Sequence, residues 1–213
     1  MKHYGDVMFT ETVKAEQTLQ GSREAYEKMT SRPAPTELSE RERAFIEARD
    51  SFYMATVSET GWPYLQHRGG PAGFLKVLGP TTIAFADYRG NRQYLSKSNL
   101  AGDDRVSLFL MDYPNRARLK VAGHARVIDA STDEDLLRAL ETEGKGRIER
   151  LFVIDVEAFD WNCPQFITPR FTEEQIVEMV GDRVEALQLE NSALKAKLAA
   201  LEELVEQRSN DSI

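Results

Sequence analysis

Apolar and polar residues alternate through the middle of the chain in short runs, a pattern typical of β-strands. Seven such runs occur: "FYMATVS" (52–58), "YLQHR" (64–68), "GFLKVLG" (73–79), "TTIAFA" (81–86), "RVSLFLMD" (105–112), "RARLKVAGHARVID" (116–129) and "RLFVIDVE" (150–157). Turn residues separate them, with Gly61 where a hairpin connection favours positive φ. Seven short strands suggest a small closed or partly open barrel, because closure removes exposed strand edges.

Helical patterns flank these runs. Ser39 and Glu42 have the spacing of a capping box at the start of one helix, and residues 131–144 read as another before the last strand. Residues 12–29 form a helical pattern that "SRPAP" (31–35) ends. We therefore divide the chain into an N-terminal helical arm (1–35), a barrel domain (36–171) and a C-terminal helix with a short tail (172–213). We expect the arm to wrap over a neighbouring part or to stay mobile.

The C-terminal segment carries a heptad pattern. The seam residues are Val180, Val184, Leu187, Asn191, Leu194, Leu198, Leu201 and Val205. This spacing predicts a coiled coil, and Asn191 at an a position favours a parallel, two-stranded state. Thr172 and Gln175 offer a capping box at the start of the helix. Two alternatives are an amphipathic helix packed on its own domain, and pairing with a different helical protein.

Composition and charge narrow the class of protein. The net charge of −8 argues against nucleic acid, yet residues 66–126 hold ten Lys or Arg against four Asp, so a small anionic ligand fits there. The single cysteine, Cys163, excludes an internal disulfide and offers no metal-site signature. We read it as a small buried hydrophobe rather than a redox thiol. No run is long enough for a membrane helix and no signal peptide is recognisable, so we expect a cytoplasmic protein.

The order of several motifs resembles a known family. "QHRGG", "FADYRGNRQYLSKSNL", "DRVSLFLMDY" and "RARLKVAGHARV" together look like the pyridoxamine 5′-phosphate oxidase-like, FMN-binding split β-barrel family, over roughly residues 36–171. The resemblance implies a mainly β fold with helices and a homodimer with FMN at the subunit interface. It also implies that "GNRQ" (90–93) binds the FMN phosphate. Independently, a guanidinium beside free N–H groups at a helix start suits a phosphate.

The resemblance also implies a set of cofactor-binding residues. Arg92 is the first choice for the phosphate, with Asn91 and Gln93 at the expected helix start. Arg68, Gly70 and Lys76 would line the ribityl and phosphate side, while Ala86 and Asp87 would approach the flavin through strand backbone. Arg118 would reach across the dimer interface. Trp161, Gln165 and Arg170 match the place where relatives carry a tryptophan and an arginine near the flavin or substrate.

Departures from the family pattern limit the expected activity. The true oxidases carry "GSRK" where this chain has "GNRQ", and their C-terminal arginine-and-histidine signature is not recognisable here. We therefore expect an FMN-dependent oxidoreductase other than a pyridoxamine phosphate oxidase, driven by NAD(P)H or a reductase and using a small organic acceptor or oxygen. The pattern identifies no catalytic acid or base. The alternatives are a flavin-binding sensor that signals through its coiled coil, and a relative that binds a deazaflavin or haem.

Overall fold

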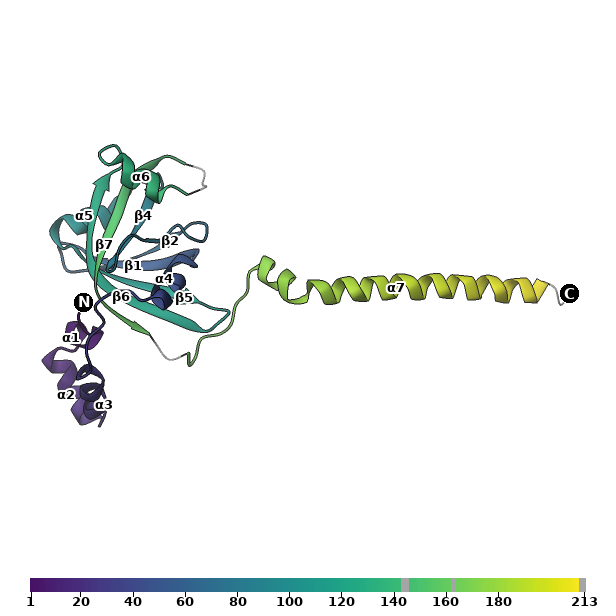
Figure 1. Ribbon diagram of the computed structural model, residues 1–213, viewed down its shortest axis with the longest axis horizontal. Helices are drawn as coiled ribbons and strands as arrows, with labels where there is room; N and C mark the ends of the chain where they lie inside the picture. The colour runs from purple at the N-terminus through teal and green to yellow at the C-terminus, as the bar shows by residue number, and fades with distance from the viewer. Residues whose placement is uncertain (143–145, 162–163, 211–213) are drawn as a thin grey trace. The chain divides into compact units, whose positions relative to one another are not determined.

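The structure is a computed structural model that describes residues 1–142, 146–161 and 164–210, with side chains up to residue 203. The chain divides into two compact units, Met1–Thr168 and Pro169–Ile213. The elements of the first unit are α1 (Tyr4–Met8), α2 (Glu11–Leu19), α3 (Arg23–Thr30), α4 (Glu40–Glu47), β1 (Ser51–Val57), β2 (Pro63–Gly69), β3 (Lys76–Val77), β4 (Thr82–Tyr88), α5 (Leu95–Gly102), β5 (Arg105–Asp112), β6 (Ala117–Asp129), α6 (Glu134–Leu140) and β7 (Ile148–Trp161), as shown in Figure 1. The second unit holds α7 (Glu173–Asn210).

The seven predicted runs all form strands of one strongly curved antiparallel sheet, in the order β2-β1-β5-β6-β7-β4-β3 (Figure 1). The expected fold class, mainly β with helices in a split-barrel arrangement, is confirmed. Gly61 has φ +84 in the β1–β2 turn, as expected. Two elements are shorter than predicted: β3 keeps only Lys76–Val77, and α6 starts at Glu134, where the side chain of Asp133 caps the helix.

A chain of aromatic rings forms the centre of the core. Phe52 stacks on Phe74 with ring centroids 5.7 Å apart and meets Phe85 edge-on at 5.3 Å. Phe85 in turn stacks on Phe152 at 4.9 Å. These rings come from β1, β4, β7 and the loop before β3. They therefore bring strands from opposite sides of the curved sheet into contact. Phe152 also lies at the edge of the cavity described below.

Helix α4 begins with the predicted capping box, which is confirmed: Ser39 and Glu42 bond each other's backbone N–H groups. Glu42 is buried and also accepts a hydrogen bond of 2.7 Å from the indole N–H of Trp161. Burial alone would raise the pKa of Glu42, but hydrogen bonds from Ser39 and Trp161 outweigh it and hold that pKa below its usual value. The Trp161 ring packs edge-on against Phe45 at 4.7 Å.

The N-terminal arm consists of three short helices, α1 to α3. The predicted pattern over residues 12–29 forms two helices instead of one, because the chain turns at Gly21 with φ +73. Phe9 and Tyr26 pack edge-on at 5.1 Å within the arm. The arm is tied to the sheet at Lys2, whose backbone N–H donates to the carbonyl of Glu157 on β7 at 2.8 Å.

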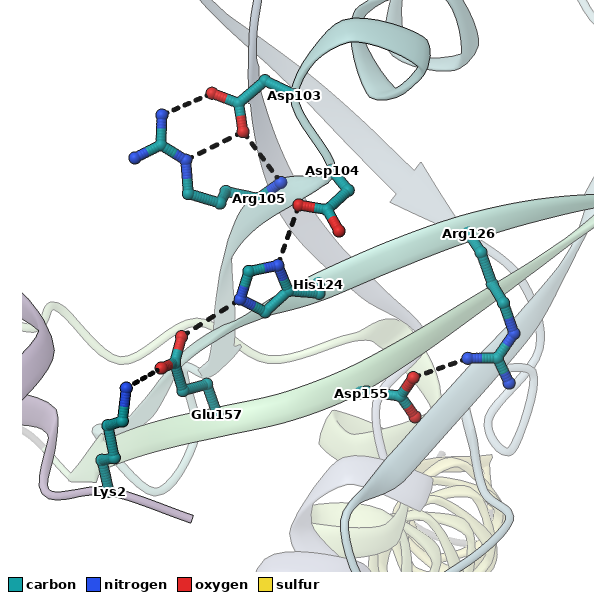
Figure 2. A network of polar contacts seen from close by, with 8 residues as sticks. All are labelled: Lys2, Asp103, Asp104, Arg105, His124, Arg126, Asp155 and Glu157. Atoms are coloured by element: carbon teal, nitrogen blue, oxygen red, sulfur yellow. Dashed lines mark hydrogen bonds and ion pairs between the residues drawn. The ribbon is translucent and has the colours of Figure 1, made fainter.

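A polar network on the surface of the sheet extends this attachment (Figure 2). The ammonium of Lys2 contacts Glu157 Oε1 at 2.7 Å, and Glu157 Oε2 lies 3.2 Å from Nε2 of His124. The other ring nitrogen of His124 lies 2.8 Å from Asp104. The bond to Asp104, helped by Glu157, raises the pKa of His124 despite its partial burial. Protonated His124 on β6 therefore links Asp104, the residue before β5, to Glu157 on β7, which also holds Lys2 of the N-terminal arm.

We expect this network to weaken as the pH rises. Because the folded pKa of His124 lies above its unfolded value, its stabilisation is complete below about pH 6.5 and disappears as the pH passes the folded pKa. The side chains of His124 and Asp104 are 45% and 60% exposed, so solvent screening should keep the loss under about 1 kcal/mol. Urea unfolding at several pH values from 6 to 9 measures this loss in the free energy of unfolding. A His124→Gln variant should lose this part of the pH dependence, and an unchanged dependence would contradict the assignment.

Helix α7 of the second unit confirms the helix predicted at the C-terminus and its capping box. The Thr172 N–H donates to Gln175 Oε1 at 3.0 Å, and the Gln175 N–H donates to Thr172 Oγ1 at 3.3 Å. Its 38 residues span about 57 Å. Within the described residues, no helix is both long and apolar enough to cross a membrane. The predicted coiled-coil pairing remains a prediction.

Candidate functional site

A polar cavity of about 210 Å³ opens beside the end of the aromatic core. Strands β2, β4 and β7 form its walls, together with the loop that leads from β4 into α5. The cavity is lined by Tyr64, Gln66, Arg68, Asp87, Tyr88, Gly90, Asn91, Arg92, Gln93, Tyr94, Leu95, Ser96, Lys97, Arg150 and Phe152. The cavity thus brings together five of the twelve predicted cofactor-binding residues: Arg68, Asp87, Asn91, Arg92 and Gln93.

Asp87 joins two arginines within this cavity. Its Oδ1 accepts from Nη1 of Arg68 at 2.5 Å, and its Oδ2 accepts from both Nε and Nη2 of Arg150 at 2.8 Å. All three side chains are largely buried, with exposed fractions of 12–14%. Nε of Arg68 is buried and has no hydrogen-bond partner among the described residues. The Arg68 guanidinium also lies 5.0 Å from the ring centroid of Phe152.

The loop before α5 has an unusual backbone. Arg92 and Tyr94 adopt positive φ angles of 62 and 58, so their side chains leave the chain in directions that ordinary loop residues do not take. Nε of Arg92 donates to the Tyr94 hydroxyl at 3.0 Å, and this bond lowers the pKa of Tyr94. The Tyr94 ring in turn covers the guanidinium of Arg150 at 5.0 Å.

The expected position of the helix start was wrong by a few residues. Helix α5 begins at Leu95, not at Asn91–Gln93. The loop continues through Tyr94, whose positive φ is not a helical conformation. The Gln93 N–H already has a hydrogen-bond partner within the loop, since it donates to Asn91 Oδ1 at 3.2 Å. The residues of the first turn, Leu95–Lys97, also line the cavity. The positive end of the α5 dipole therefore lies at the cavity, a few residues later in the sequence than predicted.

Three further predicted residues lie outside the cavity lining. An added Cβ on Gly70 would come within 2.7 Å of Phe74 Cγ, so the glycine at this position is explained by core packing. Lys76 is half-buried on the short strand β3. The Ala86 side chain belongs to a second buried cluster with Leu140 and Leu151. The predicted contacts of these residues with a cofactor remain untested.

The remaining predicted residues are distributed elsewhere. Arg118 lies on β6, where its Nε is buried without a hydrogen-bond partner among the described residues. Trp161 packs against α4 and lies outside the cavity lining. Gln165 is exposed in the first unit, and Arg170 is exposed in the second. Cys163, predicted to be buried, lies outside the described residues.

Sequence reasoning missed Arg150, Tyr94 and Lys97. Arg150 reaches the cavity because β4 pairs with β7 in a register that sets Asp87 opposite Arg150. Nothing in the local pattern marks a pairing between residues so far apart in sequence. Tyr94 and Lys97 stand directly after "GNRQ" and could have been included by extending the motif into the first turn of the helix.

The chemistry of the cavity suits a dianion. Arg68, Arg92, Lys97 and Arg150 contribute four cationic side chains, while Asp87 is the one carboxylate in its lining. Arg92 and Lys97 are exposed and accessible to a ligand, whereas Asp87 holds the other two cations in place. Guanidinium groups beside a helix N-terminus favour a phosphate ester. Among the described residues, no group of three or more His, Cys, Asp or Glu side chains could hold a metal ion.

Comparison with known proteins gives a family match. A family model described as "Pyridoxamine 5′-phosphate oxidase" matches residues 38–160, more than half of the chain. No curated protein matches the sequence.

Solved structures with a similar fold have low sequence identity. HupZ from Group A Streptococcus is 13% identical with a TM-score of 0.47, covering 62% of this chain and 98% of its own. A putative pyridoxamine 5′-phosphate oxidase from Lactobacillus delbrueckii is 19% identical with a TM-score of 0.44, covering 58% and 93%. An FMN-binding protein from Syntrophomonas wolfei is 13% identical with a TM-score of 0.44, covering 68% and 97%. At these values the likenesses say nothing about ligand or activity.

Proposed function

The chain belongs to the pyridoxamine 5′-phosphate oxidase family, and from that premise we propose that it is a homodimeric, FMN-dependent oxidoreductase. The observation that carries this proposal is the cationic cavity formed by β2, β4, β7 and the start of α5. When bound, FMN would supply hydride or electron transfer between NAD(P)H or a reductase and a small organic acceptor or oxygen. The protein's own residues bind and orient the cofactor.

The phosphate end of FMN fits the cavity residues best. Arg92 and Lys97 offer exposed cations, and the N-terminus of α5 adds backbone N–H groups beside them. The buried Nε of Arg68 is a donor that lacks a partner among the described residues, as expected of a group kept for a ligand. Asp87 keeps Arg68 and Arg150 in fixed orientations, so little side-chain ordering should be needed when the phosphate binds.

The size of the cavity supports a site completed by a second subunit. Its volume of about 210 Å³ is below the roughly 300–1,000 Å³ of a typical small-molecule site, so it would hold only part of the cofactor. The sheet face opposite the core also carries apolar side chains that a partner could cover. Tyr53 and Leu65 are 36% and 63% exposed there, and Phe109 is half-buried. Arg118 lies near Phe109, with its guanidinium 5.8 Å from the ring centroid.

Absorption spectroscopy tests the proposed function directly. We expect protein purified without added cofactor, or mixed with FMN and freed of excess, to show flavin bands that bleach on anaerobic addition of NADH or NADPH. Retained flavin bands that neither nucleotide bleaches would indicate another electron donor or a sensor that signals through α7. A protein that retains no FMN at all would rule out the proposal.

A further inference from the structure

Helix α7 carries a row of exposed apolar side chains that is interrupted at Asn191. Its heptad seam includes Val177, Val180, Val184, Leu187, Leu194, Leu198 and Leu201, and these are 44–61% exposed. Val177 extends the predicted seam by one a position towards the start of the helix. So long an apolar row on a solvent-exposed helix marks an interaction surface. We propose that α7 pairs in parallel and in register with α7 of a second copy of this chain.

The width of the seam favours a coiled coil over packing on a globular surface. A helix that covers a domain usually adds apolar residues at e or g, which broadens the stripe. From residue 183 to residue 202, the e and g positions that flank the seam are all polar: Arg183, Gln188, Glu190, Lys195, Lys197 and Glu202. Within residues 177–201, valine occupies two of the a positions, Val177 and Val184, and leucine occupies three of the d positions, Leu187, Leu194 and Leu201. β-Branched residues at a with leucine at d favour two strands.

The charges at these flanking positions are complementary to a second copy. In a parallel pair, the g residue of one helix faces the following e residue of the other. Glu190 then meets Lys195 of its partner helix, and Lys197 meets Glu202. Each pair occurs twice by symmetry, and the remaining pair, Arg183 with Gln188, is not repulsive. A second copy therefore satisfies this surface without any other partner.

Asn191 sets the direction of the pair. In a parallel, in-register dimer its amide faces the identical amide of the other helix, and the two can hydrogen-bond within the seam. In an antiparallel pair, a positions face d positions, so the Asn191 amide would lie against a leucine. A buried amide without a partner destabilises the pair, because it gives up its hydrogen bonds to water and gains none in return. This cost disfavours the antiparallel arrangement.

Disulfide trapping in the full chain tests both pairing and direction. In a Cys163→Ser background, which removes the one native thiol, Leu194→Cys places a thiol at a d position and Leu189→Cys at an outward-facing f position. Leu194 and Leu189 are both leucines of α7, 56% and 68% exposed, so neither change should prevent folding. In-register helices bring the two d thiols within disulfide range and hold the f thiols apart.

We expect mild oxidation to link the Leu194→Cys chains at least about ten times faster than the Leu189→Cys chains, because pairing gives the d thiols a much higher effective concentration. Equal rates would mean random collision of tails, and no link at position 194 would mean an antiparallel pair or another partner. Either result overturns the proposal. The test does not depend on FMN, so it stands apart from the proposed activity.

Discussion

An Asp87→Ala variant should have a free energy of unfolding about 3 kcal/mol lower than that of the wild-type protein. The change leaves the Arg68 and Arg150 guanidiniums, which are only 13–14% exposed, without their shared carboxylate. Breaking a buried ion pair from one side typically costs 3–5 kcal/mol. The lower end applies because Glu149 continues to contact Arg150 at 3.0 Å. Thermal unfolding should show a fall of roughly 6–12 °C in Tm for a unit of this size.

Inorganic phosphate should partly reverse this loss. The two freed guanidiniums would gain a dianionic partner, so phosphate should raise the Tm of the variant more than chloride does at equal ionic strength. Asp155→Ala is the matched control, because Asp155 pairs with Arg126 at 2.6 Å but is 53% exposed, and its loss should cost less than about 1 kcal/mol. Equal losses in the two variants would show that Asp87 is no more than a surface partner.

An Arg92→Ala variant should bind FMN about 10 to 100 times more weakly. The expected loss corresponds to one charge-assisted hydrogen bond of roughly 1.5–3 kcal/mol, and each 1.4 kcal/mol changes affinity tenfold. Titration of flavin fluorescence or isothermal calorimetry measures the dissociation constant. Arg126→Ala removes the same charge from an arginine outside the cavity lining and should leave affinity nearly unchanged.

Arg92→Lys separates charge from geometry. Lysine keeps the positive charge but cannot make bidentate contacts or reproduce the Nε bond to Tyr94, so it should restore only part of the affinity. Full FMN affinity in the Arg92→Ala variant would remove this loop from the proposed site. The cationic wall formed by Arg68 and Arg150 would then be the remaining candidate.

Local patterns in the sequence predicted the elements well. The strands, the turn at Gly61 and the capping box of Ser39 with Glu42 depend on neighbours within a few residues, and all three are present. The end of the loop before α5 could not be predicted in the same way. Arg92 and Tyr94 have positive φ, and a non-glycine residue gives little signal of that conformation.

Long-range contacts account for what the sequence did not reveal about the site. The ion pair of Asp87 with Arg150 depends on the register of β4 against β7. Trp161 was assigned to the flavin or substrate side because the family that the sequence resembles carries a tryptophan at this place. In the fold, the indole N–H of Trp161 donates a hydrogen bond to Glu42, which lies 119 positions earlier in the sequence. Strand order and helix docking decide such contacts, and neither is encoded in a short motif.

The backbone of the loop before α5 also bears on how the protein could evolve or be engineered. Two non-glycine residues in the left-handed region, Arg92 and Tyr94, each cost about 1–2 kcal/mol relative to a relaxed conformation. A glycine at either position would relieve that cost but remove a side chain from the cavity wall. If the loop binds the phosphate as proposed, selection for heat resistance alone would therefore favour changes that weaken this binding, a stability–function trade-off at two identified positions.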